Sequence, residues 1–317
     1  MKIRKEPEGS ISSGLRDPAE KYITVIRHSE RRADFMLIRK KNLEIIGRDG
    51  AVIPAIFTGG SDRRAVLIAH GICGDKNEWY DTSARIAERL EEKGIACLRI
   101  DFRGHGDSRE PLSSFMPSTQ LADMESAFSW LQEKGVGEII PLGISFGGPG
   151  ALRLAAAHFG EIRTCMLVAP VTDYRRNILA PDTSWGKETF AAVPDGSGGV
   201  CYRLSDTYIL GNALIRELRE LDIPAIFERI SEQNRRDPEG RKQRILIFHG
   251  ERDPKIAFDG SRELALKYPE TVGLTALPDT VHGLTQTGDE SFSAPQTMKN
   301  LETVIAAAVS GADTVTG

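Results

Sequence analysis

The residues that could carry chemistry begin with a serine placed between two glycines. The segment Gly143-Ile144-Ser145-Phe146-Gly147 follows the apolar run Glu138–Leu142 and precedes a stretch rich in Ala and Leu. A serine on a tight turn between a strand and a helix exposes its hydroxyl above the sheet, and larger neighbours would collide there. The pattern therefore predicts that Ser145 is a nucleophile.

A serine hydroxyl needs a histidine as general base and a carboxylate that orients this histidine. Asp253 and His282 each lie in a segment that directly follows an apolar, strand-like run. We predict a triad of Ser145, His282 and Asp253. Two other acidic residues in loop positions, Glu251 and Asp173, are the alternatives to Asp253.

Acyl transfer also needs N–H groups that stabilise the oxyanion. The segment His70-Gly71-Ile72-Cys73-Gly74 follows the apolar run Ala65–Ala69. We expect the Ile72 N–H to face the Ser145 turn, and the Phe146 N–H to be the second donor.

Several aromatic side chains could line an acyl or aromatic pocket, although core packing explains them about as well. They are Trp79, Trp185, Phe190, Tyr202 and Tyr208. We predict substrate contacts for Trp79, Trp185, Tyr202 and the thiol of Cys73, which lies beside a predicted oxyanion donor.

Other reactive residue types have structural interpretations. His70 and His249 precede Gly at strand ends, where shaping the turn is their expected role. Asp123 and Glu125 would lie two residues apart on a helix and would not face each other, so we expect a solvated face. The four cysteines are widely spaced and include no CxxC pair, which indicates reduced thiols. We expect no metal and no cofactor.

The elements that position these residues follow from the apolar pattern. Leu43–Ile46 and Ala51–Phe57 flank an Asp-Gly turn and predict an antiparallel hairpin. Further apolar runs then alternate with amphipathic segments, as in parallel strands whose two faces are covered by helices. These runs are Ala65–Ala69, Ile95–Ile100, Glu138–Leu142, Thr164–Ala169, Arg244–Phe248 and Val272–Leu277. The pattern predicts an α/β protein with a mostly parallel sheet and a ligand site at the carboxyl ends of its strands.

Helices are predicted in four of the intervening segments. One runs from a cap at Asp75 to about Lys93, and the others are Ser118–Lys134, Phe146–Phe159 and Ser261–Lys267. The segment 170–243 is far longer than a connection between a strand and a helix, so we expect it to fold as an element of its own.

In combination, five motifs resemble the α/β-hydrolase superfamily. They are HGxxG at 70–74, the run Arg99–Ser108, GxSxGG at 143–148, HGxxD at 249–253 and the final His282-Gly283. The chain order of serine, acid and histidine is also that of the superfamily. The resemblance is closest to serine esterases and lipases with short acyl or cinnamoyl specificity, relatives of the monoglyceride-lipase-like and serine-aminopeptidase-like hydrolases. It covers about residues 43–310, and it departs from many relatives at Ile144, where they carry His.

The resemblance implies a domain organisation. Residues 43–169 and 244–317 would form the hydrolase core, 170–243 would be a cap over the active site, and 1–42 would be an N-terminal extension without a counterpart. The same resemblance implies that the loop around His105 is structural.

Composition narrows the classes of partner. With 41 Lys+Arg and 45 Asp+Glu the formal net charge is −4, so no basic field attracts nucleic acid. No apolar run approaches the ~20 residues of a membrane span. The charged start lacks the apolar stretch of a secretory signal, which indicates a cytoplasmic protein. The N-terminal segment also offers a surface for a second subunit, so a homodimer is compatible with the sequence.

These features predict a metal-free serine hydrolase that cleaves a small-molecule carboxylic ester of a small or medium acyl group. The same triad could serve a thioesterase, an amidase or aminopeptidase, or an acyltransferase, because an acyl-enzyme is common to these reactions. A second alternative is a non-catalytic protein that keeps the hydrolase fold to bind a ligand.

Overall fold

Eight strands build the main sheet of the chain. The computed structural model describes residues 40–196, 198–237, 240 and 242–311. The strand order is β1-β2-β4-β3-β5-β6-β10-β11. The bounds are Lys40–Ile46 for β1, Val52–Thr58 for β2, Ser61–Ala69 for β3, Ile95–Ile100 for β4, Glu138–Ile144 for β5, Thr164–Val168 for β6, Arg244–Gly250 for β10 and Val272–Leu277 for β11.

The pairing confirms the predicted sheet. Strand β2 is antiparallel to both β1 and β4, and every other neighbouring pair in the sheet is parallel. The Asp-Gly turn at 49–50 joins β1 and β2, as the sequence predicts. The six strands after β2 in this order are parallel to one another. The loops that follow them therefore meet at one edge of the sheet.

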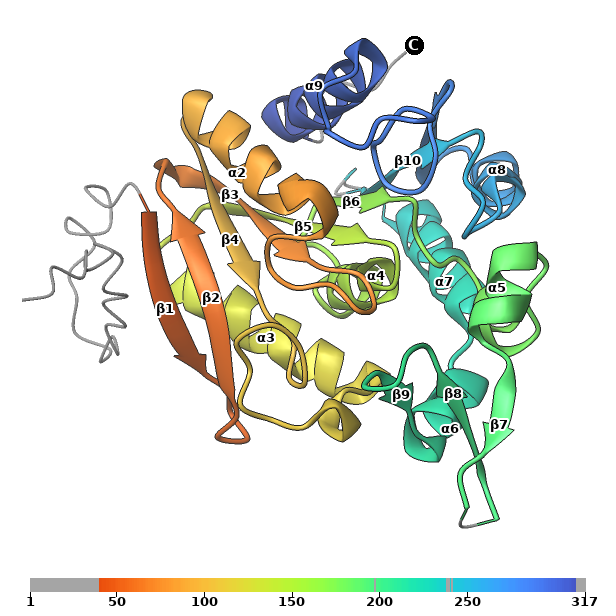
Figure 1. The fold of residues 1–317 in the computed structure, drawn as a ribbon. Helices are drawn as coiled ribbons and strands as arrows, with labels where there is room; N and C mark the ends of the chain where they lie inside the picture. The colour runs from red at the N-terminus through yellow and green to blue at the C-terminus, as the bar shows by residue number, and fades with distance from the viewer. Residues whose placement is uncertain (1–39, 197, 238–239, 241, 312–317) are drawn as a thin grey trace, which may run out of the picture.

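Six helices cover the sheet in two layers (Figure 1). Helices α2 and α9 lie on one face, and α3, α4, α7 and α8 lie on the other. Their bounds are Thr82–Glu92 for α2, Pro117–Glu133 for α3, Gly147–Ala157 for α4, Ile223–Arg236 for α7, Phe258–Lys267 for α8 and Pro295–Ser310 for α9.

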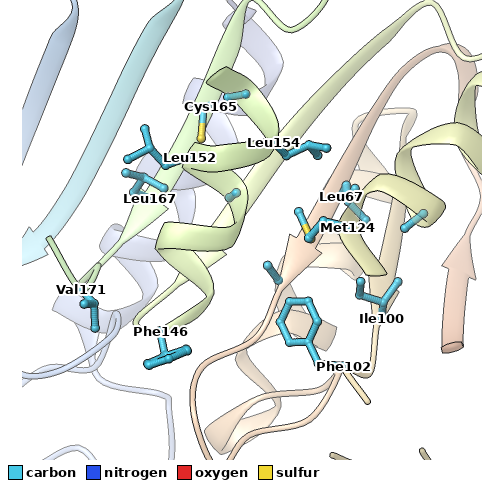
Figure 2. Packing of buried hydrophobic residues seen from close by; sticks show 14 of the residues in the cluster. Leu67, Ile100, Phe102, Met124, Phe146, Leu152, Leu154, Cys165, Leu167 and Val171 are labelled. Carbon is cyan, nitrogen blue, oxygen red and sulfur yellow. The ribbon is translucent and has the colours of Figure 1, made fainter. Parts of the chain in front are cut away.

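Alternate residues of one strand pack into different cores, because successive side chains point to opposite faces of a sheet. In β3, Val66 and Ile68 belong to the core under α2 and α9, whereas Leu67 packs into the core with Met124 of α3 and Leu152 of α4. Figure 2 shows part of the second core. Burial on both faces explains why the strands read as continuous apolar runs.

The helix predicted from Asp75 begins later than expected. Helix α2 starts at Thr82, and a short 3-10 turn, Trp79–Asp81, precedes it. The carboxylate of Asp75 accepts a hydrogen bond from the Asn77 N–H at 2.6 Å, which closes a local turn rather than capping a helix. The buried ammonium of Lys76 turns inward to Asp101. Positive φ values at Glu78, Tyr80 and Asp81 interrupt a regular helix before Thr82.

The segment 170–243 has two parts. The first carries a separate three-stranded sheet of β7 (Ala192–Pro194), β8 (Val200–Arg203) and β9 (Ile209–Leu210), with helices α5 (Ser184–Thr189) and α6 (Asn212–Glu220). Figure 1 shows these elements grouped beside the main sheet. The last part, α7, packs against α4 in the helical layer of the main sheet.

Most of the expected N-terminal extension, residues 1–39, lies outside the described residues. Among the helices of the described part of the chain, none combines the length and the apolar character needed to cross a membrane.

Candidate active site

Ser145 sits on a strained turn between β5 and α4. Its φ is 53°, and its N–H donates to the Val168 carbonyl at 2.9 Å. A Cβ on Gly147 would lie 2.2 Å from the Ala69 carbonyl oxygen, and one on Gly143 would lie 2.5 Å from the carbonyl oxygen of Gly147. Both positions therefore require glycine, as the sequence motif predicts, and the serine is held at the carboxyl end of β5.

The two predicted partners of Ser145 lie beside it. The Nε2 atom of His282 is 3.0 Å from the Ser145 Oγ, and its Nδ1 atom is 2.7 Å from Oδ2 of Asp253. A carboxylate only accepts hydrogen bonds, so Nδ1 carries the proton and Nε2 is free to accept the serine proton. The loops after β5, β10 and β11 supply the serine, the acid and the histidine respectively.

Asp253 is buried, and its carboxylate is held by several donors. Oδ1 accepts from the N–H groups of Lys255 at 2.8 Å and Ile256 at 3.1 Å. Burial acts to raise the pKa of this carboxyl, but the charge of His282 and the hydrogen bonds from His249 and His282 hold the pKa far below its usual range. The carboxylate therefore stays ionised and can stabilise an imidazolium.

His249 is a partner of the acid that sequence reasoning assigned only to turn shape. Its Nε2 is 3.2 Å from Oδ2 of Asp253, and its Nδ1 is 2.7 Å from the Ser261 hydroxyl. The imidazole is fully buried. The sequence predicts that His249 lies at the end of a strand, before Gly250. It does not predict the contact with Ser261, because helix α8 is brought to this histidine only by the fold.

The alternative acids do not reach His282. Glu251 is exposed, and its N–H donates to the Leu277 carbonyl. Asp173 accepts from the Arg175 N–H and lines a separate cavity of about 190 Å³.

The predicted oxyanion loop lies against the serine. A Cβ on Gly71 would be 3.2 Å from the Ser145 Cβ, a tight contact that favours glycine at this position. The Gly71 N–H donates to the carboxylate of Glu78, and this leaves the next residue, Ile72, at the cavity wall. Phe146 opens helix α4 directly after the serine.

Glu78 is a positioning residue that the sequence did not reveal. Its carboxylate accepts from the N–H groups of Gly71 and Trp79. Burial raises the pKa of this carboxyl, while those two hydrogen bonds oppose the change. The sequence predicts a helix over this segment, and a glutamate on the surface of a helix gives no indication that it binds the N–H groups of a neighbouring loop.

A cavity of about 700 Å³ opens at the predicted triad. Ser145 and His282 lie in its wall, and so do three of the predicted substrate contacts, Cys73, Trp79 and Trp185. This volume is of the size that holds small organic ligands. Most of the wall comes from loops of the main sheet, and Trp185 comes from α5.

Tyr202, the fourth predicted contact, does not line the cavity. Its side chain is 3% exposed and packs in the hydrophobic core, with its ring centroid 5.8 Å from that of Phe190. In β8 the residue falls on the buried face of the small sheet. The prediction was therefore wrong, and core packing explains this aromatic residue.

The thiol of Cys73 lies at the cavity but is not activated. Burial raises its pKa to about 11, although the hydrogen bond with Tyr208 and the charge of Lys255 act in the opposite direction. The thiolate is the nucleophilic form of cysteine. The residue is therefore a wall of the cavity rather than a second nucleophile.

Two buried histidines support the loops around the site. The Nε2 of His70 accepts from the Phe102 N–H at 3.1 Å, and its Nδ1 is 2.8 Å from the Gly71 carbonyl. Burial lowers the pKa of His70 to about 4. Burial and the charge of His70 lower the pKa of His105 to about 3. His105 also contacts the hydroxyl of Tyr208. Both imidazoles are neutral structural groups at neutral pH.

Asp123 corrects another expectation. We expected it on a solvated helix face, but it is fully buried. Its Oδ1 accepts from the Arg103 guanidinium at 2.6 Å, and its Oδ2 accepts from the Arg103 N–H at 3.1 Å. Arg103 also pairs with Asp49. Arg103 and Asp123 are 20 residues apart in the sequence, so the periodicity of the helix alone does not predict their contact.

Comparisons with known proteins agree with this architecture. Residues 64–196 match a family model described as the α/β hydrolase fold. The chain is 33% identical to the lipase LipV of Mycobacterium tuberculosis over 112 residues, which are 35% of this chain and 39% of that protein. It is 28% identical to a carboxylesterase of Bacillus subtilis over 103 residues, 32% of this chain and 40% of that protein. These matches span about two fifths of either relative.

A solved structure resembles the chain over a larger part. Est1E from Butyrivibrio proteoclasticus, with ferulic acid bound, has a TM-score of 0.63 at 20% identity. The match covers 84% of this chain and 96% of that one. At this identity the similarity concerns the fold.

Proposed function

We propose that this chain, which belongs to the α/β-hydrolase superfamily, is a serine hydrolase that cleaves a carboxylic ester through an acyl-enzyme. The observation that carries the proposal is the continuous hydrogen-bonded line from the Ser145 hydroxyl through His282 to Asp253 in the wall of one cavity. Relatives named lipase and carboxylesterase support the choice of an ester.

Acylation begins at the serine. As the Ser145 Oγ attacks the ester carbonyl carbon, its proton passes to Nε2 of His282 and the carbonyl oxygen becomes an oxyanion. The Asp253 carboxylate stabilises the imidazolium that forms. When the intermediate collapses, the bond to the alcohol oxygen breaks and His282 returns the proton to this oxygen. The alcohol leaves, and the acyl group stays on the serine.

Deacylation repeats the same steps with water. His282 takes a proton from the water, the hydroxide attacks the acyl carbon, and the serine oxygen leaves with the proton that His282 gives back. We assign the N–H groups of Ile72 and Phe146 as donors to both oxyanions. Each such donor typically lowers the barrier by about 3 kcal/mol.

We assign the cap to residues 170–222 and the rest of the expected cap segment to the core. The packing of α7 against α4 supports this boundary. Trp185, Thr189 and Leu204 are the cap residues in the cavity wall, so we propose that they help to choose the acyl group.

The test is the rate of hydrolysis of p-nitrophenyl acetate, butyrate and octanoate. Ser145→Ala should lower kcat by a factor on the order of 10⁵ to 10⁶ without changing the melting temperature. Ser126→Ala is the matched control, because the hydroxyl of Ser126 donates to a carbonyl within α3 and lies outside the cavity wall. If the Ser145→Ala variant kept a tenth of the activity, Ser145 would not be the nucleophile.

Matched substrates decide between the reactions that share an acyl-enzyme. We expect kcat/KM to be highest for an oxygen ester when the same acyl group is offered as an ester, a thioester and an amide. Added alcohols or amines should not divert most of the acyl group from water. A preference for the thioester or the amide, or predominant transfer to the added acceptor, would replace the esterase assignment.

A further inference from the structure

Beside the triad, one lysine is held between two indole rings. The Nζ of Lys255 lies 5.7 Å from the ring centroid of Trp79 and 5.3 Å from that of Trp185. All three side chains are in the wall of the catalytic cavity. They come from different segments: the turn before α2, helix α5 of the cap, and the loop after β10. An ammonium over the face of Trp is attracted by the negative face of the ring.

The main chain of Lys255 is fixed with respect to both the triad and the cap. Its N–H donates to Oδ1 of Asp253 at 2.8 Å. Its carbonyl accepts from the hydroxyl of Thr183 at 3.0 Å, and Thr183 caps α5 by accepting from the Gly186 N–H. The cation therefore has a defined place relative to the acid of the triad and to Trp185.

Trp79 is presented to this cation by an unusual backbone. Glu78, Tyr80 and Asp81 have φ values of 62°, 57° and 55°, in the left-handed region that L residues seldom adopt. The turn leaves the Trp79 side chain 64% exposed at the cavity. Strained backbone of this kind persists only where its surroundings hold it in place, and it gathers at functional sites. Here the hydrogen bonds of the Glu78 carboxylate hold it.

No carboxylate in the described part of the chain forms an ion pair with Lys255. Three acidic residues line the cavity, and two of them already accept hydrogen bonds. The Glu78 carboxylate accepts from two N–H groups. The Asp289 carboxylate accepts from Ser291, Ala294 and Thr297. Glu290 is exposed at the rim. Ring faces attract the charge of an ammonium, but they are weak acceptors for its three donors. The donors of Lys255 are thus available to a group in the cavity.

We propose that Lys255 binds a carboxylate carried by the ester substrate, so that the enzyme prefers acidic esters over neutral ones of the same length. This inference rests on the proposed esterase function and names its substrate class. A carboxylate pairs with an ammonium through short, charge-assisted hydrogen bonds. The two indoles flank the Lys255 ammonium at the cavity wall, so little side-chain freedom is lost when the substrate binds. Their faces also provide apolar contact for the chain that links the carboxylate to the ester.

The test compares substrates that differ only in charge. One pair is p-nitrophenyl monoadipate and p-nitrophenyl hexanoate, which places the carboxylate in the acyl group. A second pair is 3-carboxyphenyl butyrate and phenyl butyrate, which places it in the alcohol. We expect the wild type to favour the acidic member of at least one pair in kcat/KM, through a lower KM, and the favoured pair identifies which side of the ester Lys255 holds.

Variants of the lysine locate the effect. Lys255→Met should lower kcat/KM for the favoured acidic ester by about 10- to 100-fold and change that for its neutral partner by less than about twofold. Lys255→Arg should keep most of the preference because it keeps the charge. The matched control is Lys134→Met: its Nζ lies 5.4 Å from the Trp130 ring centroid, but Lys134 is outside the cavity wall, so the preference should not change.

The neutral esters keep the two proposals separate. Their hydrolysis by Lys255→Met reports that this variant is folded and that the triad works. The inference is overturned if the wild type does not favour the acidic member of either pair, or if the preference survives in Lys255→Met. A failure of the esterase proposal gives a different result. In that case the Ser145→Ala variant would hydrolyse both members of a pair as fast as the wild type, or the wild type would hydrolyse neither.

Discussion

Two buried aspartates each hold a basic side chain, and only one of these two bases can exchange a proton. Asp253 meets His282, and Asp123 meets Arg103, at 2.7 Å and 2.6 Å respectively. Histidine can take up and release a proton near neutral pH, whereas the guanidinium of arginine stays charged. His282 also touches Ser145 in the cavity, while Arg103 reaches only carboxylates. A buried aspartate that holds a basic side chain thus marks a candidate reaction centre only when this base can titrate and touches a nucleophile.

The largest expected effect breaks the first pair. Asp253→Asn should lower kcat for p-nitrophenyl butyrate by about 10⁴-fold, because the amide no longer holds His282 in the tautomer that accepts the serine proton. The control is Glu251→Gln in the same loop, where the side chain is exposed. Steady-state kinetics of both variants decide the point. A loss in Glu251→Gln comparable to that in Asp253→Asn would mean that the acid has been misassigned.

The next effect breaks the second pair. Asp123→Asn should lower the free energy of unfolding by about 3 kcal/mol, because it leaves the buried Arg103 charge without its main partner. The rate per folded molecule should stay the same, since neither residue lines the cavity. Urea unfolding and active-site titration measure the two quantities. Glu133→Gln, which changes an exposed carboxylate at the end of the same helix, should change stability little. A selective fall in kcat for Asp123→Asn would contradict the contrast.

The pH dependence of stability tests the buried histidines that support the loops. The pKa is about 4 for folded His70 and about 3 for folded His105, against about 6.5 for an unfolded histidine. Between these values the unfolded chain binds more protons, so stability falls as the pH drops below about 6.5. At pH 5 each histidine should cost about 2 kcal/mol relative to neutral pH.

Urea unfolding at pH 7.5 and pH 5, in the wild type and in His70→Gln, measures this loss. The variant starts from a lower stability but should lose less of it on acidification, because one of the two buried histidines with a lowered pKa is gone. An equal loss in both proteins would show that His70 is not held neutral by burial.

The smallest expected effect concerns the link between the cap and the oxyanion loop. The hydroxyl of Tyr208 accepts from the Cys73 N–H at 3.1 Å and contacts His105, so it ties the small sheet to the residue after Ile72. Tyr208→Phe should lower kcat by about 5- to 10-fold for neutral and acidic esters alike, with KM unchanged. Tyr202→Phe is the matched control in the core of the cap. A change confined to KM would place Tyr208 in substrate binding instead.

Local pattern predicted most of the fold and the residues that meet at the triad. The runs for β4 and β11 end where the strands end, because buried parallel strands are continuously apolar and bounded by turns. The turn around Ser145 follows from its glycines, since steric contact at 143 and 147 excludes any side chain.

Features that depend on distant contacts escaped prediction. The late start of α2 follows from the left-handed turn at Glu78, whose carboxylate accepts from the Gly71 N–H. The burial of Asp123 goes with its pairing with Arg103. The roles of Glu78, Tyr208 and Lys255 likewise rest on neighbours from other loops. The C-terminal helix α9 was not predicted either, although its apolar positions cover one face of the sheet.

The central claim is that Ser145 is a nucleophile activated by His282. A fluorophosphonate tests this most directly, because the serine oxygen displaces fluoride and keeps the phosphonyl group. Mass spectrometry of the intact protein followed by peptide mapping should find one adduct, on Ser145 in the wild type and on no residue in Ser145→Ala. An adduct on another residue such as Cys73, or a wild type that takes up no label, would contradict the account.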